Sequence, residues 1–235
     1  MPSVRTRSVL STTAKQEQLL ALARRRQATR MQGYACIGDF HDGLYECDHV
    51  SPPTRSAGNL DADVMVMLQD WNSSDKVGDS RTDERVELGY TPNLPTNKNL
   101  DRLLNVHLGL ARSDTYITNV FPFVKPGGTS EKIPKRDMVW AAREFALPQV
   151  TIVNPKLLIC IGKETFNSLR VACALPTCPD LDSVVASPFD IGETRVWGQA
   201  HTAQQAQNTR NRGGVDRVSN DWMRMKQDYE RVRAG

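Results

Sequence analysis

Four short runs of β-forming residues, separated by longer helical segments, constrain the fold of this chain most strongly. They cover Val64 to Leu68, Tyr116 to Val120, Leu157 to Ile161 and Thr194 to Trp197. The second and third runs are almost continuously apolar, as strands covered on both faces require. This order predicts an α/β protein, a three-layer α/β/α sandwich with a central, mainly parallel four-stranded sheet.

Amphipathic patterns predict helices between the strands. One helix begins near Asn97, carries a leucine stripe and ends at Gly109, whose missing side chain suits a C-terminal cap. Another begins at Pro134 and is expected to end where Pro148 interrupts it. A third covers 163–174. The stretches expected to form loops, and therefore to supply ligand sites, are 31–60, 71–96, 122–133 and 198–218.

A last helix is expected near the C-terminus, with Ser219 as its cap. Its apolar spacing of four, three, four and three indicates a buried face, so Trp222 is expected in the core rather than as a base-stacking platform. The residues of that face are Val218, Trp222, Met225, Tyr229 and Val232.

Length and composition indicate one domain. The 235 residues, 39% of them hydrophobic, suffice for one sizeable core, so a single domain over 1–235 is predicted. No apolar run reaches membrane-spanning length and no signal-peptide core is present, so we expect a cytoplasmic, monomeric protein without a membrane partner. The five scattered cysteines are typical of free thiols rather than of a disulfide framework.

Positive charge gathers at the N-terminus, although the net charge is only +3. Residues 1–30 contain several basic side chains but a single acidic one, Glu17. Two interpretations stay open for this segment: a docked helix with Leu19, Leu20 and Ala23 as its apolar face, or a basic arm that seeks DNA.

Polar residues follow the predicted strands at the points where the strands end. Gln69 and Asp70 follow the first strand, Asn119 ends the second, and His201 comes shortly after the fourth. Ligands of parallel α/β sheets bind beyond the carboxyl ends of the strands. Singly, Asp or Asn at such a place is more often a turn former or helix cap. Together, the carboxylate, the amide and the imidazole predict one site.

Several separated motifs, in order, resemble the uracil-DNA glycosylase superfamily over about residues 61–230. They are QDW, YITNVFPFVKPGG, PKLLICIGKETFNSL and AHTAQQAQNTRNR. The resemblance implies that Asp70 activates water, that Asn119 reads the edge of uracil and that His201 contacts the departing base. PTNKNLDRLLNV is similar to the helix that follows the family's aromatic stacking residue, which makes Tyr90 the candidate for that stack.

The residue types suit cleavage of an N-glycosidic bond, in which the sugar becomes cationic while negative charge gathers on the base. An ionised Asp70 would favour the cation, and a neutral His201 would donate a hydrogen bond to the uracil oxygen. The amide of Asn119 can pair with an imide N–H and a neighbouring carbonyl, a pattern that cytosine reverses. Gln69 and Trp71 complete the residues expected to bind the base.

A base inside a duplex cannot reach such a pocket, so the enzyme would flip it out or act on single strands. The polar loop from 201 to 217 is expected to hold DNA, although an ordinary solvated loop is the alternative. Earlier in the sequence, Lys125 and the glycine turn after it have two equally good interpretations. They bind a phosphate through backbone amides, or the turn only reverses the chain. The residues expected to contact DNA are Lys125, Gln204, Gln205, Arg210 and Arg212.

Some features depart from the family pattern. Leu68 stands where many members have glycine, and Trp71 and Asn72 lie where one branch places a tyrosine that excludes the methyl group of thymine. The cysteines lack the close N-terminal pair of the iron–sulfur branch. A zinc site built from Cys36, His41, Cys47 and His49 is disfavoured, because the spacing matches no zinc finger. We therefore expect no metal and no cofactor.

These patterns predict a monofunctional uracil-DNA glycosylase of base excision repair. Its partners would be uracil-containing DNA, single- or double-stranded, and its products free uracil and abasic DNA. Two alternatives stay open. One is an N-glycoside hydrolase or transferase acting on nucleosides or nucleotides, and the other is a DNA-binding relative without catalysis.

Overall fold

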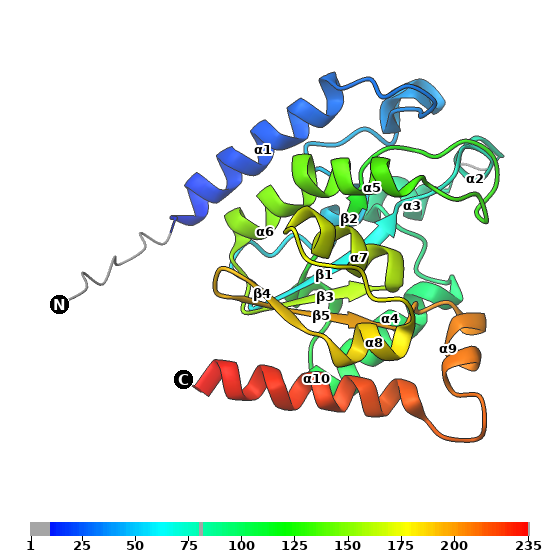
Figure 1. The fold of residues 1–235 in the computed structure, drawn as a ribbon. Coiled ribbons are helices and arrows are strands. Elements are labelled where there is room, and N and C mark those ends of the chain that lie inside the picture. Colours follow the sequence, from blue (N-terminus) through cyan, green and yellow to red (C-terminus); the bar gives the residue numbers. More distant parts are fainter. Residues whose placement is uncertain (1–9, 80–81, 235) are drawn as a thin grey trace.

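A five-stranded sheet forms the centre of the computed structural model, which describes residues 10–79 and 82–234 (Figure 1). Across the sheet the order is β2, β1, β3, β5, β4, and all neighbours are parallel except the β5–β4 pair. The strands are β1 (Val64–Asp70), β2 (Tyr116–Phe121), β3 (Leu157–Ile161), β4 (Phe189–Ile191) and β5 (Thr194–Gln199). The four predicted strands are confirmed. The short antiparallel edge strand β4 was not predicted, because three residues show no periodicity.

Helices cover both faces of the sheet, which confirms the three-layer α/β/α sandwich (Figure 1). Successive side chains of β1 point to opposite faces, so Met65 and Met67 join one apolar cluster and Val64 and Val66 join the other. The first face is covered by α1 (Thr12–Ala28), α5 (Lys135–Ala141), α6 (Leu147–Val153) and α7 (Lys163–Ala172). The second is covered by α4 (Pro95–Leu108) and α10 (Arg217–Ala234).

Short helices occupy much of the sequence expected to form loops. α2 (Ser74–Asp79) and α3 (Asp83–Leu88) lie within 71–96, and α9 (Gln204–Arg210) lies within 198–218. A further short helix, α8 (Leu181–Ala186), precedes β4. Helices of six or seven residues complete fewer than two turns, so no apolar stripe marks them in the sequence.

The predicted end of α4 at Gly109 is confirmed. The prediction that the helix after Pro134 ends at Pro148 is wrong. Gly109 has a φ of 68° and caps α4 through its N–H. Past Ala141, in contrast, the chain continues through a π-helical turn into α6. Pro148 has no N–H for the carbonyl of Glu144, four residues earlier, and the Arg25 guanidinium donates to this oxygen instead. A contact from α1 therefore compensates for the proline.

The C-terminal helix begins earlier than predicted. α10 starts at Arg217, and the side chain of Asp216, rather than Ser219, accepts the hydrogen bond that caps it. Trp222 is fully buried, as expected for a core residue, but Val232 is 41% exposed and does not belong to the buried face.

The first described helix, α1, is docked on the protein. Leu19 and Ala23 are buried, whereas Leu20 is only partly buried. Arg26 is fully buried and donates to the carbonyls of Cys47 and His49, each at 2.9 Å. The docked-helix interpretation therefore holds for residues 12–28, while residues 1–9 of the basic segment lie outside the described part. Within that part, no helix has both the length and the apolar character needed to cross a bilayer.

Candidate active site

The carboxyl ends of the parallel strands meet at one edge of the sheet, on the right in Figure 1. Val66 of β1 is in register with Ile117 of β2, and both side chains face α4 and α10. Asp70 lies four residues after Val66, and Asn119 lies two residues after Ile117. Since side chains of a strand alternate between the faces, Asp70 and Asn119 point to the same face as Val66 and Ile117. They line one pocket, which encloses about 360 Å³ of space, part of it open to solvent.

Other residues around this pocket come from segments that sequence reasoning took as loops. Of the residues expected to bind the base, Tyr90 and Trp71 line it. Gln69 does not line it, but its side chain hydrogen-bonds Asp70. The remaining lining residues are Pro53, Leu68, Asn72, Arg85, Thr91 and Asn97.

Asp70 is a nearly buried carboxylate with a buried cation beside it. Its side chain is 12% exposed, and Nζ of Lys125 lies 3.2 Å from its Oδ2. Burial raises the pKa of Asp70, because desolvation disfavours the charged form, while Lys125 and, more weakly, His201 oppose that rise. Burial therefore outweighs its neighbours, and the pKa of Asp70 lies above its ordinary value.

His201 follows β5 and interacts electrostatically with Asp70, although it does not line the pocket itself. The backbone N–H of Ala203 donates to its Nδ1 at 3.0 Å. The ring is held over Gly162, where an added Cβ would lie 3.7 Å from Cδ2 of the histidine. Part of the residue is exposed, yet the surrounding protein lowers the pKa of His201 by desolvation. Asp70 raises this pKa again, and Lys125 lowers it.

Asn119 is fully buried, and one side of its amide is already bonded. The hydroxyl of Ser51 donates to Oδ1, whereas Nδ2 has no partner among the described residues. A buried amide N–H₂ without a partner is costly unless a ligand accepts its hydrogen bond. Since Asn119 lines the pocket, this donor suits a ligand carbonyl.

The aromatic wall of the pocket is fixed from behind. The guanidinium carbon of Arg112 lies 3.9 Å from the ring centroid of Tyr90, and Nε of Arg112 bonds Asp101 at 2.8 Å. Next to Tyr90, the carbonyl oxygen of Gly89 accepts a hydrogen bond from Nε1–H of Trp71 at 2.9 Å. Its φ is 77°, and a Cβ there would lie 1.8 Å from the carbonyl oxygen of Pro52. Only glycine fits this position.

Two of the residues expected to contact DNA are held inside the protein. Lys125 is 6% exposed and bonds Asp70 and the carbonyl of Thr129, so its ammonium is not placed as a surface phosphate contact. The side chain of Arg210 is 9% exposed and pairs with both Asp182 and Asp221. For these two residues the sequence shows the charge but not the partner that holds it.

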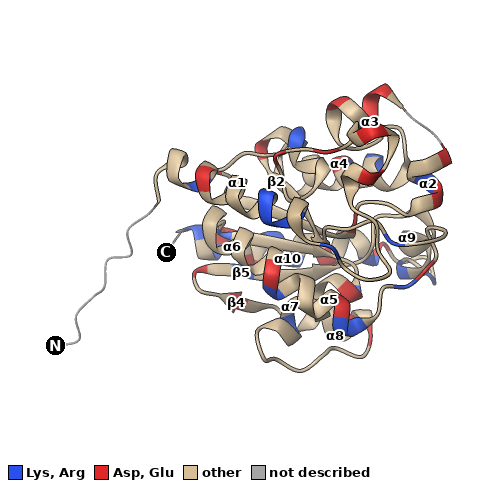
Figure 2. Ribbon diagram, turned by 90° about the horizontal axis from the view of Figure 1, so that it is seen from above, with Lys and Arg blue, Asp and Glu red and all other residues tan. Residues whose placement is uncertain are grey.

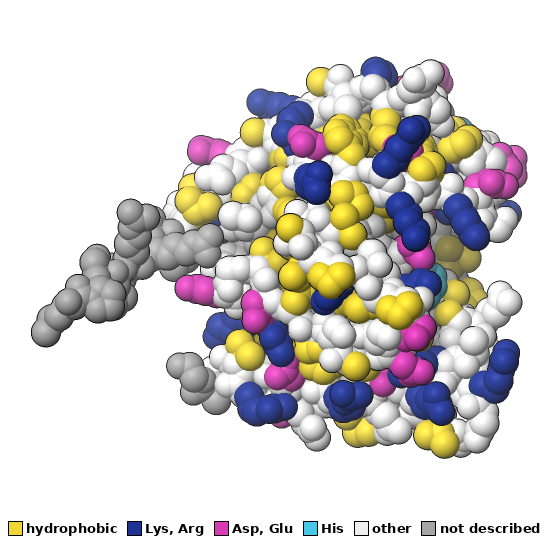
Figure 3. Space-filling view, viewed as in Figure 1, with side chains coloured by type: hydrophobic (Ala, Val, Ile, Leu, Met, Phe, Trp, Pro, Cys, Tyr) yellow, Lys and Arg dark blue, Asp and Glu magenta, His cyan; other side chains and the backbone are white. Residues whose placement is uncertain are grey.

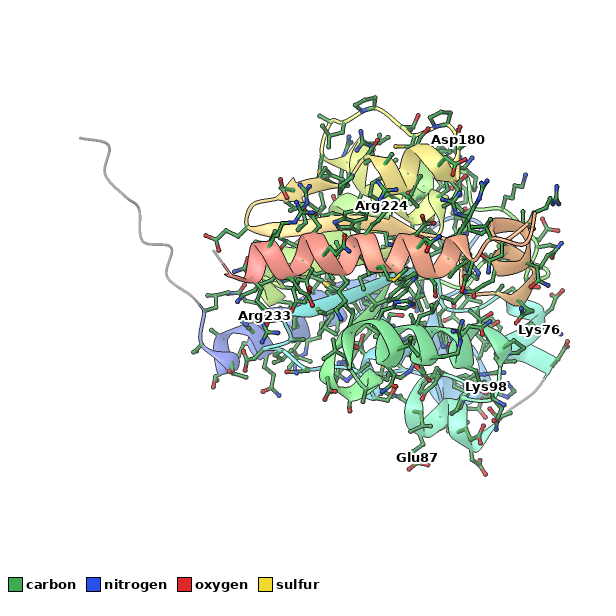
Figure 4. All side chains as sticks on the ribbon, turned by 90° about the horizontal axis from the view of Figure 1, so that it is seen from below. Lys76, Glu87, Lys98, Asp180, Arg224 and Arg233 are labelled. Atoms are coloured by element: carbon green, nitrogen blue, oxygen red, sulfur yellow. The ribbon has the colours of Figure 1, made fainter. Side chains whose placement is uncertain are left out.

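The other three expected DNA contacts are exposed and lie on or after α9. This helix is at the right-hand end of the molecule in Figure 2. Gln204 and Gln205 open α9, and Arg212 follows it without an ion pair in the described part of the chain. Lys76 and Lys98 are exposed at the same end of the molecule, and Arg233 lies at the opposite end (Figure 4). Lys and Arg side chains flank a recess at this edge in the space-filling view (Figure 3).

The N-terminal cysteines and histidines engage protein atoms. Sγ of Cys36 contacts Nη1 of Arg30 at 2.8 Å, and Nε2 of His41 contacts the carbonyl of Val77 at 2.7 Å. Among residues 10–79 and 82–234, no three His, Cys, Asp or Glu side chains are grouped so that they could hold a metal ion.

A comparison with known protein families gives a match over much of the chain. The family model of the uracil DNA glycosylase superfamily matches residues 78–225, more than half of the chain. The chain belongs to the uracil-DNA glycosylase superfamily. Of the three central residues, Asn119 and His201 lie inside the matched range and Asp70 precedes it.

The chain is also similar to an individual uracil-DNA glycosylase. A type-4 uracil-DNA glycosylase of Saccharolobus solfataricus is 32% identical over 72 residues. The match spans 31% of this chain and 32% of that relative, so it covers about a third of either protein.

Sequence reasoning missed three contacts around this pocket, those of Ser51 with Asn119, of Arg112 with Tyr90 and of Lys125 with Asp70. Ser51 precedes the 3₁₀ turn Pro52–Arg55 and is 68 residues away from the amide it bonds. Arg112 is a lone arginine in a turn. No local pattern announces such contacts, because they arise only when distant loops close over the sheet.

Proposed function

We propose that this protein is a uracil-DNA glycosylase, which hydrolyses the N-glycosidic bond of a uracil flipped out of DNA and leaves an abasic site. The observation that carries the proposal is the shared pocket of Asp70 and Asn119, with His201 beside the carboxylate. Superfamily membership supports the reaction class, and the name of the type-4 relative supports uracil as the base.

The residues divide the work as follows. Asp70 orients a water toward the anomeric carbon and stabilises the cationic sugar, while His201 donates from Nε2 to the oxygen of the departing base. Asn119 binds the edge of the base through its free Nδ2, and Tyr90 stacks on the ring. Arg212, Gln204 and Gln205 contact the DNA outside the pocket.

A labelled single strand with one uracil tests the proposal. The wild-type protein should release uracil, and alkali should then cut the strand at the abasic site. Asp70→Asn should lower the rate by about 10²–10⁴-fold, as for loss of a catalytic acid or base, with DNA binding by anisotropy retained. Asp63→Asn is the matched control, because Asp63 directly precedes the same strand at its far end.

The same assay separates the alternatives. Release of uracil from free deoxyuridine but not from the oligonucleotide would identify a small-molecule hydrolase. Binding of the oligonucleotide without release, while a known uracil-DNA glycosylase cuts it, would identify a non-catalytic relative and overturn the proposal.

A further inference from the structure

Lys125 is built into the loop after β2 so that its ammonium reaches Asp70 and not the solvent. Its backbone carbonyl accepts from the N–H of Ser74 at 2.8 Å, which ties the loop to the segment after β1. The hydroxyl of Ser74 accepts from the N–H of Gly127 at 2.9 Å, closing the connection from the other side. The loop that carries Lys125 is therefore fastened to the segment that follows Asp70.

Within the described part of the chain, the ammonium of Lys125 contacts two groups. Nζ donates to the carbonyl of Thr129 at 2.9 Å and lies 3.2 Å from Oδ2 of Asp70. The side chain of Lys125 is 7% exposed, and Lys125 does not line the pocket that Asp70 and Asn119 share. The cation therefore contacts the carboxylate from outside the pocket and leaves the pocket free for a ligand.

We propose that Lys125 is a positioning residue, whose ammonium keeps Asp70 ionised and holds its carboxylate in one orientation for attack by water. This inference rests on the proposed function, since it takes Asp70 as the catalytic carboxylate. It replaces the expectation that Lys125 grips a DNA phosphate.

The charges around Asp70 allow the effect to be isolated. The titratable and charged side chains nearest to it are Lys125 and His201, with Arg85 and Tyr90 on the wall of the same pocket. His201 is kept neutral, because desolvation lowers its pKa. Lys125 is the strongest of the three groups that oppose the effect of burial on the pKa of Asp70, ahead of His201 and Gln69. An opposite charge this close lowers the pKa of a carboxyl by about 1–3 units.

The decisive experiment compares Lys125→Met, which keeps the length of the side chain, with Lys125→Arg, which keeps the charge. A ¹³C titration of the Asp70 carboxyl should give a pKa about 1–3 units higher in Lys125→Met than in the wild type, and a nearly unchanged value in Lys125→Arg. An unchanged pKa in a folded Lys125→Met protein overturns the inference. This readout needs no uracil excision, so it stands apart from the proposed function.

The pH profile of excision supplies the second test. For Lys125→Met, the acid limb of the rate should move to higher pH with the Asp70 pKa. The rate should recover part of the loss at high pH, where the carboxyl is ionised in both proteins, and the remaining loss in kcat measures the lost orientation. The opposite result would be a loss of activity that is the same at every pH, appears in KM and becomes smaller with added salt. It would show that Lys125 contacts a DNA phosphate and would overturn the inference.

A measurement on the wild-type protein covers the case in which Lys125→Met does not fold. The ¹⁵Nζ resonance of Lys125 should shift as Asp70 titrates, because the two groups lie 3.2 Å apart. A resonance that does not respond to this titration contradicts the pairing.

Discussion

The backbone N–H of Ala203 donates to Nδ1 of His201 at 3.0 Å, and this contact decides which nitrogen of the ring carries a proton. An Nδ1 that accepts a hydrogen bond is unprotonated, so in the neutral ring the proton is on Nε2. Desolvation lowers the pKa of His201 and keeps the ring in this neutral form. Nε2–H is therefore the donor available to a departing base.

Ala203→Pro tests this contact without touching the histidine. Ala203 has a φ of −60°, which proline adopts, so the change removes the N–H with little strain at that residue. We expect ¹⁵N spectra of His201 to show a mixture of tautomers and kcat to fall, with KM little changed. Ala203→Ser retains the N–H and is the matched control. Equal spectra for the proline and serine variants would contradict the assignment.

Ser51→Ala should impair the reading of the base. Without the Ser51 hydroxyl, Oδ1 of buried Asn119 loses its partner and the amide is free to turn. We expect uracil excision to weaken by roughly 10-fold, consistent with about 1–1.5 kcal/mol for one hydrogen bond. The ratio of the excision rates of uracil and cytosine should become smaller, as measured with two oligonucleotides that differ only in this base. Ser56→Ala, which removes a hydroxyl bonded to Leu88 instead, should leave this preference unchanged.

Arg210 and Arg212 should differ in what they support. The side chain of Arg210 is 9% exposed, and Arg210→Met would leave the 6% exposed carboxylate of Asp221 without its cation. Breaking a buried pair in this way costs about 3–5 kcal/mol, so urea unfolding should show a large loss of stability. Arg212→Met is the control, since Arg212 is exposed and has no ion pair in the described chain.

The Arg212→Met protein should keep its stability but bind DNA more weakly, with a smaller dependence on salt concentration. Equal unfolding curves for the two variants would show that the Asp182–Arg210–Asp221 contacts do not stabilise the fold. Unchanged DNA affinity of Arg212→Met would remove Arg212 from the proposed DNA surface.

The strands and their order along the chain could be predicted, because parallel strands covered on both faces need nearly continuous apolar runs. The same logic located Asp70 and Asn119, since residues that end parallel strands meet at one edge of the sheet. What the sequence could not show is which charges pair. Lys125 and Arg210 looked like DNA contacts because their acidic partners come from other segments of the chain.

The helix that continues through Pro148 illustrates the same limit. A proline inside a helical pattern normally ends the helix, because one carbonyl loses its donor. Here Arg25, more than a hundred residues away in the sequence, donates to the carbonyl of Glu144. Local rules predict the break correctly for an isolated segment, and a tertiary contact reverses the outcome.

Acid sensitivity should reside partly in Asp228 of α10. Its Oδ2 accepts from Nε of Arg195 and from Nε1 of Trp197, each at 2.8 Å. Burial raises the pKa of Asp228, but the hydrogen bonds from Arg195 and Trp197, with the charges of Arg195 and Arg231, outweigh burial, so the pKa lies below its ordinary value. A carboxyl whose pKa is lower in the folded than in the unfolded state contributes stability above the unfolded pKa, near 4. That contribution disappears as the pH falls through the folded value.

Asp228→Asn should therefore lower the free energy of unfolding at neutral pH and flatten its decline in acid. Urea unfolding of both proteins between about pH 7 and pH 3 measures this, since the window spans the unfolded pKa of aspartate. Glu230→Gln is the matched control, because Glu230 is 59% exposed on the same helix and, within the described residues, pairs only with Lys226. The contribution of the Asp228 carboxylate must vanish at a pH where the carboxyl is protonated in both the folded and the unfolded protein. Parallel stability curves for Asp228→Asn and the wild type would therefore show that this carboxylate contributes nothing to the pH dependence.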